Sequence, residues 1–306
     1  MVRVASEWLA TCGGCEVTIL DIGEPLLDLL SKLELVHMPV IMDHKYYGQT
    51  GEGSFEIPDA DVGLISGGIR NEENAKVAQE MRRKCKTLVA VGACANFGGI
   101  PALANLFSLQ EMMDTAYRKT RTTEATDNPS LDVPPMKDRV YSVSEVVKVD
   151  LRLPGCPTTP ELMAAAIVAL VEGRPFSLAE RSVCDDCPAR REKKAVSSFK
   201  RPLDKVEIAP GQRYEDMRCL MEQGYLCMGP ATRTGCGGKD KVPRCVRAYM
   251  PCRGCFGPIR EGANPIMDMM GALSSIGLDP RQIDDRMATF NRFVGVTGRL
   301  RPVAAR

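Results

Sequence analysis

The sequence predicts an α/β fold: a flavodoxin-like doubly wound parallel sheet, followed by a loop-rich domain with little regular structure. Three observations lead to this prediction. Short apolar runs alternate with helical segments up to about Gly173, which is typical of parallel sheets. Cysteines and glycines directly follow several of these runs. Beyond Gly173 the periodic signal fades, and the chain becomes rich in Gly, Pro and Cys.

The first element is a strand over residues 2–8, and Val17 to Leu30 then follow at helical spacing. A helix also precedes the fourth apolar run, because "NEENAKVAQEMRRK" has one apolar face. Another begins at Thr159 and Pro160, which suit an N-cap and a first helical turn. The remaining predicted strands lie in the apolar runs 33–42, 60–68, 86–95 and 149–157.

Three domains are expected from this pattern. Residues 1–178 form the sheet domain, residues 179–260 the cysteine-rich domain, and residues 261–306 a C-terminal tail that packs on the core or on a partner. Within the first domain, residues 104–148 are polar and without periodicity. We expect them to form an irregular surface excursion that contacts a partner.

Composition narrows the class of protein. The chain has 306 residues, is 44% apolar and carries a net charge of +1. Its longest apolar run, Leu162 to Val171, is too short to cross a bilayer, and its N-terminus has no leader pattern, so we expect a cytoplasmic protein without a membrane span. Residues 181–260 carry 17 Lys and Arg against nine Asp and Glu. Few aromatic residues lie among them, so balancing a bound anionic group is favoured over binding nucleic acid.

Thirteen cysteines in a cytoplasmic chain need a reason, and metal binding is the leading one. Cys12 and Cys15 follow the first predicted strand, Cys94 the fourth and Cys156 the fifth. Because ligands of doubly wound sheets bind beyond the carboxyl ends of the strands, these four cysteines are expected to converge there.

The second half of the chain holds eight more cysteines, which makes three sets of four with one left over. The cysteine left over is Cys85, which we interpret as a plain thiol. Iron-sulfur clusters are favoured, because a wide 4Fe-4S cube accepts ligands from distant loops and because Cys156 precedes a proline. Zinc held by four thiolates stays an alternative. The eight cysteines are Cys184, Cys187, Cys219, Cys227, Cys236, Cys245, Cys252 and Cys255.

The motifs, in their order, resemble the small subunit of nickel-iron hydrogenases. They are "CGGC", "VGACA", "LPGCPTTPE", "CDDC", "RCLMEQGYLCMGPATRTGC" and "MPCRGC", and they cover roughly residues 1–260. The resemblance is closest to the cytosolic methyl-viologen-reducing, coenzyme F(420)-non-reducing hydrogenases of methanogens.

The resemblance implies three 4Fe-4S clusters with assigned ligands. Cys12, Cys15, Cys94 and Cys156 match the proximal set; Cys184, Cys187, Cys219 and Cys227 match the distal set; and Cys236, Cys245, Cys252 and Cys255 match the medial set. Membrane-bound relatives usually have His at the position of Cys184 and Pro at that of Cys245. All-cysteine ligation should lower the cluster potentials here.

The resemblance also implies partners. The nickel-iron site that splits dihydrogen belongs to a large subunit, whose nickel-binding motifs this chain lacks, and the electrons leave near Cys184 and Cys219. The expected acceptor is a small iron-sulfur subunit together with heterodisulfide reductase. The alternatives are the small subunit of a deazaflavin-reducing hydrogenase, a polyferredoxin-like carrier without a catalytic partner, and a zinc-stapled scaffold.

Four further features carry weaker expectations. Glu16 resembles a family acidic residue with a proton or interface role, although a carboxylate also suits a helix start. His37 and His44 have no second histidine at ligand spacing and are interpreted as structural. Trp8 is expected to pack in the core. The methionine-rich segment around Met267 is expected to be buried against another subunit.

Overall fold

The computed structural model describes residues 1–295 except 49, 123, 194, 202–205 and 209–210. The described part of the chain divides into two compact units, residues 1–176 with 293–295, and residues 177–292. Among the described residues, no helix is long and apolar enough to cross a membrane.

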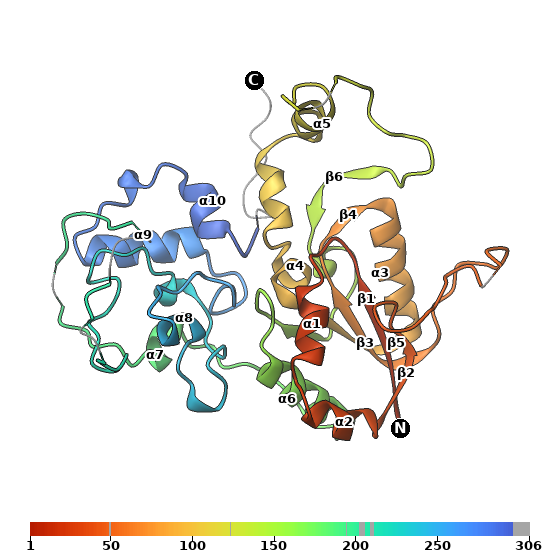
Figure 1. The fold of residues 1–306 in the computed structure, drawn as a ribbon, viewed down its shortest axis with the longest axis horizontal. Coiled ribbons are helices and arrows are strands. Elements are labelled where there is room, and N and C mark those ends of the chain that lie inside the picture. Colours follow the sequence, from red (N-terminus) through yellow and green to blue (C-terminus); the bar gives the residue numbers. More distant parts are fainter. Residues whose placement is uncertain (49, 123, 194, 202–205, 209–210, 296–306) are drawn as a thin grey trace. The chain divides into compact units, whose positions relative to one another are not determined.

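The first unit contains a five-stranded parallel sheet with strand order β2-β1-β3-β5-β7 (Figure 1). This is the flavodoxin-like order, with the second strand beside the first and the chain then moving outward. The predicted fold class is therefore confirmed. The strands are β1 (Val2–Trp8), β2 (Leu33–His37), β3 (Ala60–Ser66), β5 (Cys85–Val91) and β7 (Leu151–Leu153).

Helices cover both faces of this sheet. The helix α3 (Glu72–Lys84) packs on one face, where Ala75, Val77, Ala78 and Met81 are buried. The opposite face is covered by α1 (Gly14–Leu20), α2 (Pro25–Leu30) and α6 (Pro160–Val171), whose leucines and isoleucines line a cavity against the strands. The predicted N-cap of α6 is confirmed, because the Thr159 side chain accepts a hydrogen bond from the N–H of Leu162.

Two expectations for these elements are corrected. The helix expected over 17–30 is two helices, because Gly23 adopts a left-handed φ of 72° and Pro25 starts α2. The fourth strand ends at Val91, so Cys94 lies in the short helix α4 (Gly92–Phe97) rather than in a loop.

The excursion expected to be irregular contains regular elements. A 3-10 helix η1 (Pro101–Leu106) leads to α5 (Leu109–Tyr117), which begins with a capping box between Ser108 and Glu111. A strand β6 (Met136–Tyr141) then pairs antiparallel with β4 (Ile69–Asn71) in a separate two-stranded sheet. A further 3-10 helix, η2 (Val143–Glu145), precedes β7.

The second unit has few regular elements, as predicted. They are α7 (Val183–Asp186), η3 (Gly229–Ala231), η4 (Gly238–Asp240), α8 (Arg244–Arg247), α9 (Pro265–Ser275), η5 (Pro280–Gln282) and α10 (Arg286–Asn291). The core of this unit includes Met269 and Leu273 of α9 together with Val183, Met228 and Cys252. The α9 segment thus packs on the cysteine-bearing loops of its own unit.

Candidate metal centres

The four cysteines of the first set lie at the carboxyl ends of three parallel strands. Cys12 and Cys15 follow β1, Cys94 follows β5 and Cys156 lies between β7 and α6. Burial raises the pKa of the Cys15 thiol to about 12, with additional contributions from Glu16, Cys94 and Cys156. Burial also raises the pKa of Cys94 to about 12, and Cys156 and Cys12 add to that shift. Electrostatic interactions thus link Cys94 and Cys156 with each other and with both Cys12 and Cys15.

Glycines make room for these sulfur atoms. At Gly92, which has a φ of 82°, an added Cβ would lie 2.3 Å from the Sγ of Cys15. At Gly99 an added Cβ would lie 3.0 Å from the Sγ of Cys94. At both positions the backbone lies so close to a cysteine that only glycine, which has no Cβ, fits without displacing it.

Asn96 ties these loops together, although no sequence motif singles it out. Its Nδ2 donates to the carbonyl oxygens of Ala90 at 2.9 Å, Gly92 at 2.8 Å and Leu153 at 3.1 Å. Ala90 is the next-to-last residue of β5, Gly92 begins α4 and Leu153 ends β7, so one buried amide holds together the segments that lead to Cys94 and Cys156. No local pattern around Asn96 announces this role, because its partners include a residue 57 positions away.

The second set, in the second unit, is also joined by mutual interactions. Burial raises the pKa of Cys184 to about 12, with contributions from Cys219 and Cys187. Burial raises the pKa of Cys227 to about 12 as well, and both Cys184 and Cys219 contribute. An added Cβ at Gly229 would lie 2.9 Å from the Sγ of Cys184, which repeats the arrangement at Gly92.

The third set is linked through Cys245. Burial raises the pKa of Cys236, and Cys245 contributes to the shift. Burial raises the pKa of Cys252 well above its ordinary value, with contributions from Cys227 and Cys245. Cys255 is half-buried and follows Cys252 by three residues. The second and third sets adjoin, because the N–H of Cys252 lies 3.3 Å from the Sγ of Cys227 and donates to it.

Backbone N–H groups point at several of these sulfur atoms. The N–H of the residue two positions further on donates to the Sγ of Cys187, Cys227 and Cys252. The N–H groups of Thr158 and Arg244 donate to Cys15 and Cys236. Donors of this kind stabilise thiolates, and hydrogen bonds to sulfur tune iron-sulfur clusters.

The spacing of the thiols bears on the kind of metal group. Four thiolates on one zinc ion at about 2.3 Å would place their sulfur atoms about 3.8 Å apart. Among the described residues, no three His, Cys, Asp or Glu side chains are placed to hold a single metal ion. Thiolates that hold a 4Fe-4S cluster each bind a different iron atom, so they need not come as close together as four ligands of one zinc ion.

Cys85 lies apart from the three sets. It begins β5, at the end of the strand opposite to Cys94, and is buried in the core on the α3 face. Its Sγ packs against Gly63, where an added Cβ would lie 2.6 Å away. Burial raises the pKa of this thiol to about 11.

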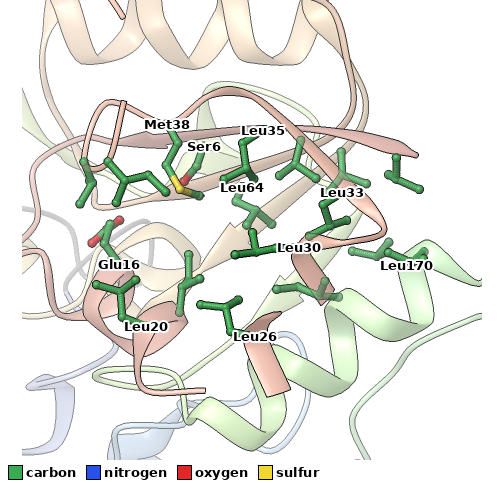
Figure 2. A pocket seen from close by; sticks show the side chains of 18 residues that line it. Ser6, Glu16, Leu20, Leu26, Leu30, Leu33, Leu35, Met38, Leu64 and Leu170 are labelled. Atoms are coloured by element: carbon green, nitrogen blue, oxygen red, sulfur yellow. The ribbon is translucent and has the colours of Figure 1, made fainter. Parts of the chain in front are cut away.

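Glu16 stands in α1 directly after Cys15 and is only 7% exposed. The Ser66 hydroxyl donates to its Oε1, whereas its Oε2 is buried without a hydrogen-bond partner among the described residues. Figure 2 shows the carboxylate at one end of an apolar cavity of about 100 Å³, near Ser6 and Met38. Glu16 is therefore a buried carboxylate in the first turn of α1, next in the chain to a cysteine of the first set.

Two other expectations are tested by burial. Trp8 is expected in the core, but it is 48% exposed, because it is the last residue of β1 and lies at the carboxyl ends of the strands. In α9, Met269 is fully buried within its own unit, whereas Met267 is 65% exposed. Burial of Met267 against another subunit stays a prediction.

His37 and His44, expected to be structural, lie together. His37 is fully buried and bonds Glu7, and its ring contacts the His44 ring. Sequence spacing did not reveal this cluster because its members come from β1, β2 and the following loop.

Known proteins are similar to this chain in sequence and in fold. The family described as NADH ubiquinone oxidoreductase, 20 kDa subunit, matches residues 12–170. The chain is 38% identical over 293 residues to a subunit of the vhu F(420)-non-reducing hydrogenase of Methanocaldococcus jannaschii, covering 95% of this chain and 94% of that protein. It is 34% identical over 310 residues to the iron-sulfur subunit of the F(420)-non-reducing hydrogenase of Archaeoglobus profundus, covering 92% and 90%.

A solved structure is also similar. It is an NAD⁺-reducing [NiFe]-hydrogenase in the H₂-reduced state, with a TM-score of 0.53 and 31% identity. The match covers 58% of this chain and 94% of the other chain.

Proposed function

We propose, from the premise that this chain belongs to the small subunits of the F(420)-non-reducing nickel-iron hydrogenases, that it carries three 4Fe-4S clusters. One observation carries the proposal: four cysteine thiols interact with one another in the first unit, and at least seven do so in the second. The division of the second unit's eight cysteines into two sets of four follows the family resemblance. Such clusters, when bound, supply one-electron transfer. The name of the Archaeoglobus profundus relative, an iron-sulfur subunit, supports this choice over zinc.

The chain's own residues would hold and tune these groups. The ligands are Cys12, Cys15, Cys94 and Cys156; Cys184, Cys187, Cys219 and Cys227; and Cys236, Cys245, Cys252 and Cys255. Backbone N–H donors such as that of Thr158 favour the more negative, reduced form. Arg191 adds a cation beside the second set, since its Nη2 donates to the Cys184 carbonyl at 2.7 Å. Cys252 is buried, which keeps water away from it, whereas Cys12 is exposed and the other ligand cysteines are half-buried.

Chemical analysis tests the cluster proposal. The anaerobically purified chain should contain about twelve iron and about twelve acid-labile sulfide atoms, four of each per cysteine set. Cys94→Ser should remove about a third of both. Cys85→Ser is the matched control, because Cys85 is a buried cysteine of the same strand–helix segment and should leave both values unchanged. Zinc in place of iron would refute the proposal.

We further propose that a large subunit with the nickel-iron site covers the apolar surface beside α1. Leu20, Val40 and Ile41 line the mouth of the apolar cavity and are 53%, 41% and 51% exposed. The same short helix carries Cys15 and Glu16. A subunit that buries these side chains would therefore also lie against the first cysteine set, where electrons from dihydrogen enter.

Co-purification tests this surface. Ile41→Glu should reduce recovery of the large subunit by at least about tenfold, because it places a charge in an apolar interface. Lys86→Glu is the control, since the Lys86 side chain is 81% exposed, does not line the cavity and lies at the end of β5 opposite to the first cysteine set. Equal recovery of the large subunit with both variants would mean that the interface lies elsewhere on the chain.

The acceptor we propose is a small iron-sulfur subunit leading to heterodisulfide reductase, in the cytoplasm. The second cysteine set is the expected exit, and Cys184 and Cys219 there are only half-buried. Co-purification of a heterodisulfide reductase flavoprotein would support this acceptor, and a deazaflavin-binding subunit in its place would contradict it.

A further inference from the structure

The carboxyl ends of β1 and β2 bury a polar cluster that contains no cysteine. Glu7 is 1% exposed and His37 is fully buried. The Nε2 of His37 hydrogen bonds the Oε1 of Glu7, to which the Tyr46 hydroxyl also donates at 2.7 Å. Among the described residues, no Lys or Arg side chain forms an ion pair with Glu7. The hydrogen-bond partners of this carboxylate are instead an imidazole, a phenol hydroxyl and the backbone N–H of Trp8.

A second imidazole completes the cluster. The rings of His37 and His44 meet edge to face, with centroids 4.2 Å apart and planes at 88°. The Nδ1 of His37 and the Nε2 of His44 are both buried, and neither has a hydrogen-bond partner in the described part of the chain. Burial and the charge of His37 lower the pKa of His44, against the opposing effect of the Glu56 backbone and Glu7. The two rings lie so close together that positive charge on one of them disfavours positive charge on the other.

The other charged groups nearby are engaged elsewhere. Burial and Glu7 raise the pKa of Tyr46, so its hydroxyl stays a donor, and Glu73 of α3 contributes to that shift. Lys76 of α3 lies over the Phe55 ring at 4.4 Å. Lys45, next to His44, pairs with Asp43 at 3.9 Å. Glu7 and the two histidines therefore remain as the groups of this polar cluster on which an exchangeable proton would reside.

Solvent can reach this cluster from one side. His44 and Tyr46 line an open surface hollow together with Tyr47 and Thr50. They belong to the long connection between β2 and β3, in whose described part no strand or helix occurs, and connections of this length usually carry a function. His44 thus stands between the hollow and the buried His37.

The cluster also lies at the edge of the sheet that carries the first cysteine set. Glu7 precedes Cys12 by five residues on the same strand end, which limits the separation of their Cα atoms to about 18 Å. For two charges about 18 Å apart in a medium with an effective dielectric constant of about 20, one unit charge changes the proton affinity of the other site about fivefold.

We propose that Glu7, His37 and His44 form a buried site that binds one exchangeable proton, and that occupancy of this site is linked to the redox state of the cluster held by Cys12, Cys15, Cys94 and Cys156. This inference rests on the proposed function for its redox partner. An added electron at the cluster raises the proton affinity of the site about fivefold. By reciprocity, a bound proton favours reduction of the cluster by the same factor.

The test is a redox titration of the purified hydrogenase complex by electron paramagnetic resonance, from about pH 5.5 to about pH 9. The signal of the first cluster is identified as the one that Cys94→Ser removes. Its midpoint potential should fall as the pH rises through the titration of the site and should be level on either side. In His37→Gln, which keeps an amide donor for Glu7, the potential should be independent of pH over this range.

Two further variants separate linkage from a merely structural role. His44→Phe keeps an aromatic ring against His37 but removes the ring nitrogens, so it should also flatten the pH profile. This variant provides the test if His37→Gln fails to fold. Tyr47→Phe lies on the same connection without touching Glu7, and its profile should match that of the unmodified chain. If the unmodified chain gives the first-cluster signal but its midpoint potential does not change with pH, the inference is wrong and the proposed function still stands. Absence of that signal would overturn the proposed function.

Discussion

Replacing Gly92 with alanine should expel the group bound by the first cysteine set. Gly92 has a φ of 82°, where a residue with a Cβ is strained by about 1–2 kcal/mol. The new Cβ would also lie 2.3 Å from the Sγ of Cys15, and relieving such a contact in a packed site costs about 1–3 kcal/mol. The two effects together destabilise the loop by about 2–5 kcal/mol, enough to displace Cys15 from its ligand position.

Iron analysis and chemical unfolding measure this effect. Iron and acid-labile sulfide should fall by about a third, because only one of three four-cysteine sets is affected. Gly173→Ala is the matched control: its φ is 65°, but nothing lies within 4 Å of an added Cβ. That variant should lose about 1–2 kcal/mol of stability and no iron. If Gly92→Ala retained full iron content and matched Gly173→Ala in stability, the close approach to Cys15 would not matter as argued.

Three further predictions concern single side chains. Cys245→Pro should convert one four-iron cluster to a three-iron cluster and raise its potential, seen as a new paramagnetic signal in the oxidised protein; an unchanged cluster inventory would refute the assignment of Cys245. Asn96→Leu should cost about 2–4 kcal/mol of unfolding free energy, because three buried carbonyl oxygens lose the two N–H groups that they share. A loss below about 0.5 kcal/mol would contradict the positioning role of Asn96. Although partial burial raises the pKa of Asp150, the N–H of Leu88 and the Arg82 guanidinium outweigh it and hold the pKa below its usual range. The stabilisation of the folded chain by ionised Asp150 is therefore present above about pH 4 and is lost as the pH falls through the pKa of Asp150 in the folded state. Asp150→Asn should thus lower the free energy of unfolding by roughly 1 kcal/mol at pH 7 and by progressively less in acid.

The sheet domain was predictable because its parallel strands are buried on both faces. Such strands read as continuous apolar runs, and a cap such as Thr159 marks where a helix starts. The break at Gly23 was also visible in the sequence, but the apolar spacing on either side of it outweighed the signal. The pairing of β4 with β6 was not predictable, since it joins segments more than 60 residues apart.

The candidate site was predictable to different degrees in the two units. The first cysteine set follows from one topological rule, that the carboxyl ends of parallel strands share one edge. The second unit offers no such rule, so its eight cysteines could be divided into two sets only through the family resemblance. Side chains whose partners come from several elements, such as Asn96 and His37, required the structure.

Diffraction at the iron absorption edge from crystals of the anaerobically purified complex tests the central claim most directly. The account predicts three groups of iron positions in this chain, each surrounded by one of the three four-cysteine sets. Disulfide bonds between these cysteines, single zinc ions at their positions, or iron groups ligated by a different division of the twelve cysteines would contradict it.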